Sequence, residues 1–246
     1  DRVPDCMKGC DLVYVPLSTP PQRLEELLNQ EVNLAVHMPR GMFGREDAIR
    51  RQLAQAEEIG VSHVWVGNLG ALALAQETDL FIHGGFSLNI FNTASVEWCE
   101  DNGLSDVELS FELTAEQARR IGGRLPRGLI AYGRLPLMIT EQCLIKNKTG
   151  ECGCQGGPAV KLTDKTGADF PVMKEADSCR SVLLNGKKLY WLDRQNDLSK
   201  LGLWAIRLNF TTENAREVDR ILEEYLTPTS FDPGACTRGL YLRGVE

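Results

Sequence analysis

Four cysteines in the second half of the chain have the spacing of ligands that could share one inorganic centre. Cys143, Cys152, Cys154 and Cys179 form a C-x8-C-x-C-x24-C series among glycine-rich turns. Four thiolates on loops can converge on a tetrahedral zinc ion or on a four-iron, four-sulphur cluster. Structural zinc sites usually carry C-x2-C pairs, which this chain lacks. The spacing therefore favours the iron–sulphur cluster and leaves zinc as the alternative.

The other cysteines carry weaker signals. Free cysteine packs well among apolar side chains, and we expect this for Cys6, Cys10, Cys99 and Cys236. The C-x3-C spacing of the first two leaves an accessory ligand role open. The first ten residues contain no apolar signal-peptide core, so we expect a cytoplasmic protein, where clustered thiols bind metal more often than they form disulfides.

Charge and hydropathy narrow the possible partners. The formal net charge is −7, which argues against a broad nucleic-acid footprint, although five arginines form a loose basic stretch between residues 119 and 134. No apolar run approaches the roughly 20 residues that a membrane span needs, so we expect no membrane partner. The chain does not begin with Met, and we expect upstream domains of the same polypeptide to be its partners.

Short apolar runs alternate with helical patterns along most of the chain. Helices are expected from Pro20 or Pro21 to Leu28, around Ile49–Ile59, Ala71–Gln76 and Thr93–Asp101, from Thr114 with a capping box to Gln117, and over Glu213–Tyr225. The expected strands are Asp11–Leu17, Val32–Met38, Val61–Val66, Leu80–His83, Val107–Ser110, Gly128–Tyr132, Leu189–Leu192 and Leu203–Phe210.

Strands that alternate with helices predict βαβ units around a parallel sheet. Eight candidates suit an α/β fold of the TIM-like (β/α)8 barrel type with a cysteine-containing, β-rich insertion after the sixth strand. A doubly wound open sheet is the second possibility. We assign residues 1–134 to the first part of the barrel, 135–188 to the metal-binding insertion, and 189–246 to the rest of the barrel and a C-terminal tail. Two hairpin signals, Lys165-Thr166-Gly167 and Asn185-Gly186, lie within the insertion.

In such a barrel, residues at the carboxyl ends of the strands face the active site. Histidines and a carboxylate at one mouth can move protons, and an arginine there can bind an anion. His63 falls inside a strand and is expected to be structural. We predict catalytic roles for His37, His83, Glu112 and Tyr132, and substrate binding by Asn68, Asn89 and Arg134.

Several segments resemble a known family. They include YGRLPLMITEQC (132–143), the C-x-C that follows, LTDKTGADFPV (162–172), CRSVLLN (179–185), NLGALAL (68–74), GGFSLNIFN (84–92) and TRGLYLRGVE (237–246). Together they are similar to the collagenase-like peptidase family of unknown catalytic type numbered thirty-two. The resemblance covers most of the chain and is strongest to the C-terminal half of the longer bacterial members.

The resemblance implies a TIM-like barrel and a 4Fe-4S cluster held by four cysteines. It also implies an oxygen-independent hydroxylase of an RNA base, such as a ribosomal RNA cytidine, with prephenate or another small anion as a partner. Some hydroxylases place a cysteine where this chain has Pro136, so the fourth ligand is Cys154 as first choice and Cys236 as second.

Older assignments within this family imply a peptidase, which we keep as an alternative. The chain has no H-E-x-x-H zinc motif and no G-x-S-x-G nucleophile elbow. A non-catalytic, metal-binding half of a larger enzyme is a further possibility.

Overall fold

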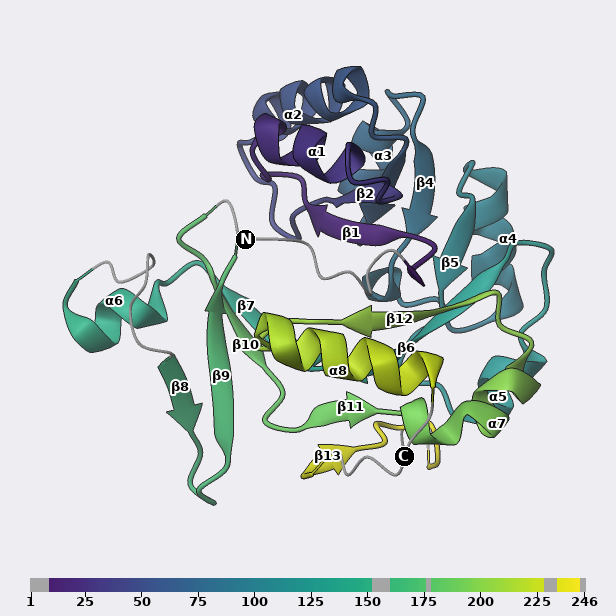
Figure 1. Cartoon of the computed structure of the whole chain (residues 1–246), viewed down its shortest axis with the longest axis vertical. Coiled ribbons are helices and arrows are strands. Elements are labelled where there is room, and N and C mark those ends of the chain that lie inside the picture. The colour runs from purple at the N-terminus through teal and green to yellow at the C-terminus, as the bar shows by residue number, and fades with distance from the viewer. Residues whose placement is uncertain (1–8, 152–159, 176–177, 228–233, 244–246) are drawn as a thin grey trace.

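The computed structural model describes residues 9–151, 160–175, 178–227 and 234–243. These residues form a large sheet with helices packed against it, and a small, separate sheet that extends from one end of the large one (Figure 1). None of the described helices is long and apolar enough to cross a bilayer.

The large sheet is built on parallel strands that follow one another in chain order. Neighbouring strands pair in the order β1 (Val13–Pro16), β2 (Leu34–His37), β3 (His63–Val66), β4 (Phe81–Gly84), β5 (Asp106–Glu108), β6 (Arg127–Gly133) and β12 (Ala205–Asn209). A doubly wound sheet would reverse its order at an internal strand. The described part of this sheet does not, so it is not doubly wound.

Helices connect these strands and cover the outside of the sheet (Figure 1). They are α1 (Pro21–Leu28), α2 (Glu46–Ile59), α3 (Leu69–Ala75), α4 (Thr93–Asp101), α5 (Ala115–Arg120), α7 (Gln195–Leu198) and α8 (Ala215–Leu226). The expected capping box at Thr114 is present, because its hydroxyl accepts from Gln117 N–H and the Gln117 side chain accepts from Thr114 N–H. Helix α2 ends at Gly60, whose φ of 106° suits glycine.

The predicted eight-stranded barrel is not confirmed as a whole, and one of its expected strands is wrong. The run Leu189–Leu192 was expected to be the seventh barrel strand, but β11 (Lys188–Tyr190) runs antiparallel to the end of β6 and carries the short β13 (Cys236–Thr237) beside it. No pairing joins β12 to β1 among the described residues. Instead, the guanidinium of Arg207 lies 4.5 Å from the centre of the Tyr14 ring across that gap.

The small sheet lies between β6 and β11 in the chain. Its antiparallel order is β7 (Pro136–Thr140), β10 (Ser181–Leu184), β9 (Asp169–Lys174) and β8 (Val160–Thr163), and α6 (Leu144–Thr149) follows β7. The Lys165–Gly167 turn joins β8 to β9 as a hairpin, with Gly167 at a φ of 85°. Asn185-Gly186 does not make a hairpin, because β10 and β11 belong to different sheets.

The main core is continuous within the large sheet and its helices. Val36, Val64, Val66 and Leu129 are buried on the strands, and Leu53 packs from α2. The alternate residues of the same strands point to the inside of the curved sheet, because side chains alternate along a strand. Polar and aromatic residues occupy many of these inward positions.

Candidate functional site

The inward side chains form a polar network in the middle of the barrel-like sheet. The carboxylate of Glu108 accepts hydrogen bonds from Arg207 Nη1 at 2.9 Å, from Trp65 Nε1 at 3.2 Å and, through its other oxygen, from Phe86 N–H at 2.9 Å. The guanidinium of Arg207 also lies over the rings of Trp65 and Tyr14, at 4.8 and 4.5 Å. The side chains of the ion pair are 11% and 9% exposed, so the pair is nearly dry.

His83 belongs to a second network on the strands beside the first. Its Nδ1 lies 2.5 Å from Asp106 Oδ2, and its Nε2 lies 2.9 Å from His63 Nδ1. His83 and Asp106 are buried, whereas His63 is half-buried. Burial first, and then the neighbouring His83, lower the pKa of His63. The predicted catalytic His83 is therefore part of a carboxylate–imidazole–imidazole chain.

His37 lies at the carboxyl end of β2, as predicted for a residue of the barrel mouth. Its ring stacks on Trp65 with centres 4.2 Å apart. Desolvation, and then the positive charge of Arg207, lower the pKa of His37 to about 3. The ring is therefore neutral near pH 7 and can accept a hydrogen bond, but it is a weak base.

Tyr132 lies near the end of β6 and faces a different group. Its hydroxyl donates to Glu213 Oε1 at 3.1 Å, and Lys188 Nζ pairs with the same oxygen at 2.8 Å. Burial and the charge of Glu213 raise the pKa of Tyr132 above its ordinary value. Tyr132, Lys188 and Cys236 line a cavity of about 50 Å³ between β11, β13 and α8.

The remaining predicted mouth residues make mainly local contacts. Asn68 caps α3 by accepting from Ala71 N–H, and its amide donates to the carbonyl of Arg40. Asn89 has a left-handed φ of 55° and is exposed, and Glu112 lies in the loop after β5. Arg134 Nη1 donates to the carbonyls of Asn185 and Gly186, so this guanidinium ties the small sheet to the large one.

The predicted mouth residues thus lie in separate groups, with His37, His83 and Tyr132 in three different sets of contacts. Sequence reasoning missed the residues that organise these sets: Asp106, Glu108, Arg207, Glu213 and Lys188. The run Asp106-Val107-Glu108-Leu109 carried a usable signal, because acidic residues alternate with apolar ones at the strand period. Such alternation usually indicates one face in water, and here that face is the inside of the sheet.

Two of the four predicted metal ligands lie in the described residues, each beside one strand of the β7–β10 pair. Ser181 of β10 pairs with Thr140 of β7, and Leu144 N–H donates to Ser181 Oγ at 3.0 Å. Cys143 follows β7 and Cys179 precedes β10, so both are at the same end of this strand pair. Cys143 also caps α6, because its Sγ accepts from Lys146 N–H at 3.4 Å.

The other two predicted ligands, Cys152 and Cys154, lie outside the described residues. Within the part of the chain that the structure describes, no group of three or more His, Cys, Asp or Glu side chains is close enough to hold a metal ion. Both described cysteines of the series carry free thiols, half-buried at residue 143 and exposed at residue 179. Their chemistry and exposure fit thiolate ligands that need two further partners.

Arg180, next to Cys179, anchors this end of the small sheet to the large one. Its Nη1 donates to the carbonyl of Gly41 at 2.6 Å, and its Nε pairs with Glu141 at 2.6 Å. Glu175 accepts from Arg40 N–H at 3.1 Å. Arg40 and Gly41 follow the carboxyl end of β2, so the contacts of Glu175 and Arg180 hold Cys179 on that side of the parallel strands. Barrel enzymes place their active sites on this side.

Three of the five arginines in the basic stretch pair with two neighbouring carboxylates. Arg119 and Arg120 both pair with Glu116, and Arg124 pairs with Glu100. This arrangement fits a solvated helix end better than a phosphate-binding surface.

A model of Peptidase family U32 matches residues 44–228, which is well over half of the chain. The chain belongs to peptidase family U32. The resemblance inferred from the cysteine-containing segments is thereby confirmed at the family level. No curated protein matches the chain.

Two solved structures resemble this U32 chain weakly. The U32 peptidase Mk0906 is 13% identical, and the match covers 50% of this chain and 60% of that chain, with a TM-score of 0.40. A chitinase from Chromobacterium violaceum ATCC 12472 is 9% identical over 89% of this chain and 91% of that chain, with a TM-score of 0.36. The described fold of this U32 member is a mixed α/β fold around a parallel sheet.

Proposed function

We propose that this chain is an iron–sulphur enzyme whose cluster is held by Cys143, Cys152, Cys154 and Cys179. The observation that carries the proposal is that Cys143 follows β7 and Cys179 precedes its partner strand β10, at the end that Arg180 anchors beside the carboxyl ends of the parallel sheet. A centre at this position would lie at the side where substrates enter barrel enzymes. Zinc is the alternative metal.

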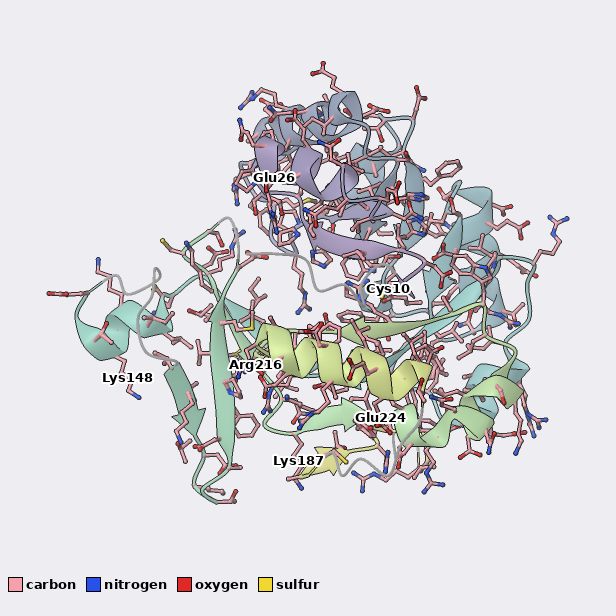
Figure 2. The ribbon with its side chains drawn as sticks, in the orientation of Figure 1. Cys10, Glu26, Lys148, Lys187, Arg216 and Glu224 are labelled. Atoms are coloured by element: carbon pink, nitrogen blue, oxygen red, sulfur yellow. The ribbon has the colours of Figure 1, made fainter. Side chains whose placement is uncertain are left out.

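The arrangement of the other cysteines supports this ligand set. Figure 1 places β13, which carries Cys236, beside β11 and apart from α6, which Cys143 caps. Figure 2 places Cys10 among the elements of the large sheet, also apart from α6, from whose far end Lys148 projects. Cys99 is buried in the core on α4. These positions favour Cys154 over Cys236 as the fourth ligand.

The cluster would supply one-electron redox chemistry at the mouth. The chain itself would supply a neutral imidazole at His37, which can accept a hydrogen bond from a bound substrate, because its pKa lies near 3 and the ring stays uncharged at neutral pH. The Glu108–Arg207 pair holds the Trp65 indole on which His37 stacks, so these two residues act by positioning that ring.

We propose oxygen-independent hydroxylation of an RNA base, such as a ribosomal RNA cytidine, as the reaction, with prephenate or a similar small anion as co-substrate. The support is the family membership together with a cysteine series that a peptidase would not need. The net charge of −7 and the paired arginines indicate that upstream domains of the polypeptide would supply most of the RNA contacts.

The cluster is tested by purifying the chain without oxygen and measuring iron, acid-labile sulphide and visible absorption. We expect on the order of four iron and four sulphide per chain. Cys143→Ser should lose the absorption, although the serine hydroxyl can replace the cysteine sulphur as the acceptor that caps α6. Cys99→Ala is the matched control and should keep it. Stoichiometric zinc without sulphide would overturn the proposal.

The reaction is tested separately, because a cluster could serve another chemistry. Ribosomal RNA incubated with protein and prephenate should gain the mass of one oxygen on a cytidine, and Cys143→Ser should abolish the gain. Unmodified RNA, together with peptide cleavage that His37→Gln abolishes, would instead establish the peptidase alternative that the family name suggests.

A further inference from the structure

We infer that His63, His83 and Asp106 form a relay that carries a proton from the amino-end face of the parallel sheet to its interior, where His83 holds it as an imidazolium. The relay lies on three neighbouring strands, β3, β4 and β5. It contains none of the proposed metal ligands.

The distances form an unbroken chain of ring nitrogens. Asp106 Oδ2 lies 2.5 Å from His83 Nδ1, and His83 Nε2 lies 2.9 Å from His63 Nδ1. A carboxylate only accepts hydrogen bonds, so His83 Nδ1 carries a proton. The Asp106 contact therefore fixes the tautomer of His83 and leaves its Nε2 to accept from His63 when the ring is neutral.

The relay connects two different environments. His83 is 4% exposed and Asp106 is 7% exposed, so neither meets bulk water directly. His63 is half-buried at the first residue of β3 and stacks on Phe81, which is 59% exposed at the first residue of β4. Both residues therefore lie at the amino-end edge, opposite the side to which Arg180 anchors the small sheet.

Titratable and charged side chains near His83 lie on three other strands, β1, β5 and β12. On β1, the Tyr14 ring contacts the His83 ring edge-on, with ring centres 6.1 Å apart. Arg207 of β12 lies over that tyrosine. Glu108 of β5 neutralises Arg207. With these two charges balanced, the Asp106 carboxylate is the group that can stabilise a positive His83.

The transfer takes up one proton from water, and no bond between heavy atoms forms or breaks. A proton from water adds to His63 Nε2, while the proton on His63 Nδ1 moves to His83 Nε2. His63 is then neutral with its proton on Nε2, and His83 is an imidazolium that donates to Asp106 and to His63 Nδ1. The reverse steps release the proton at the same face, so the interior can exchange protons without opening the mouth.

The chain contains three histidines, which makes the relay directly observable by long-range proton–nitrogen NMR of the imidazole rings. In a relay, each proton that enters at His63 also changes the protons on His83, so we expect the ring-nitrogen signals of His63 and His83 to change together. His37 should not follow them. The measurement needs neither substrate nor cluster, so its outcome is independent of the proposed function.

Two variants separate a relay from a static hydrogen bond. His63→Gln keeps a polar side chain but cannot pass a proton, so solvent exchange of the His83 ring proton should slow about tenfold or more. Asp106→Asn removes the carboxylate that stabilises a positive His83, so the His63 signals should change without those of His83. His37→Gln is the control and should change neither result.

Two outcomes would overturn the inference. One is a His83 ring proton that exchanges with water equally fast in His63→Gln, with the His37 signal unchanged as evidence of an intact fold. The other is loss of both titrations on adding one equivalent of zinc to the wild-type chain, which would show that the facing nitrogens bind a metal instead.

Discussion

The large sheet and the small sheet are stabilised in different ways. The large sheet has helices outside and a dry Glu108–Arg207 pair inside, and its core is continuous from β1 to α8. In the small sheet, Leu137 and Met138 of β7 are exposed, and within the described residues α6 is the helix that lies beside it (Figure 1). The small sheet therefore depends on its contacts at one end.

Because of this difference, the functional side chains of the two sheets are held in place in different ways. The polar groups of the large sheet are positioned by burial, because neighbouring strands fix each inward side chain. The cysteines of the small sheet are positioned by Arg180 and by whatever they bind, because a metal that joins distant ligands contributes its binding energy to local folding. Changes in the first region should act on the whole fold, and changes in the second should act locally.

The largest effect is expected for Glu108→Gln. The substitution keeps the volume but leaves the Arg207 guanidinium buried without its counter-charge, which should lower the free energy of unfolding by about 3 kcal/mol. Urea unfolding followed by tryptophan fluorescence measures this. Adding Arg207→Met should recover part of the loss, because it removes the unpaired charge.

The exposed pair between Glu116 and Arg120 is the matched control for this change. Glu116→Gln should leave the urea midpoint almost unchanged, because exposed ion pairs contribute little. Equal losses for Glu108→Gln and Glu116→Gln would contradict the view that burial distinguishes the interior pair.

The sequence predicted the large sheet well because its local signals agree with its fold. Helix α4 has the predicted bounds, and β3 and β4 fall within or one residue from the predicted runs. The interior network was missed because its partners are far apart in the chain. Glu108 and Arg207 are separated by 99 positions, and a single charge in a short strand normally indicates an exposed face.

The strand at Lys188–Tyr190 was misassigned for a related reason. Its apolar residues, Leu189 and Tyr190, are buried as expected for a core strand. Its direction depends on the path of the chain back from the small sheet, which composition does not encode. The contacts of Arg134 could not be predicted from the sequence either, because its acceptors are the backbone carbonyls of Asn185 and Gly186, which carry no sequence signal.

The second largest effect is expected on the free energy of unfolding at low pH, through His37. Its pKa falls from 6.5 to about 3 on folding, so the unfolded chain binds the proton first as the pH is lowered. Its contribution to stability is complete above about pH 6.5 and is lost progressively towards pH 3. We expect a loss of about 2 kcal/mol at pH 4, less than the full conversion of the pKa shift, because the ring keeps some contact with water.

This loss is measured as the difference between wild type and His37→Gln in urea midpoints at pH 7 and pH 4. Carboxylates that titrate in the same range cancel in the difference. A difference that stays constant with pH would show that His37 does not resist protonation, and would remove the neutral hydrogen-bond acceptor proposed at the mouth.

A smaller effect on global stability is expected for Arg180→Ala. The substitution removes the bonds to Gly41 and Glu141, and we expect about 1–2 kcal/mol of local destabilisation confined to the small sheet. Amide hydrogen exchange should speed up in β7 to β10 and stay unchanged in β1 to β5. Faster exchange in both sheets would show that the two regions unfold as one unit.

The smallest effect is expected for Asn214→Ala, which removes a cap from α8 in the large-sheet region. The Asn214 side chain accepts from Glu217 N–H at 3.1 Å, and the Glu217 carboxylate accepts from Asn214 N–H at 2.8 Å. Loss of such a cap costs about 1 kcal/mol, and because α8 packs on the main core the loss should lower the global urea midpoint. Asn214→Ser should keep the midpoint, since serine also caps. A loss visible only as fraying of α8, with no change in the midpoint, would place this helix with the locally stabilised part of the molecule rather than with the large sheet.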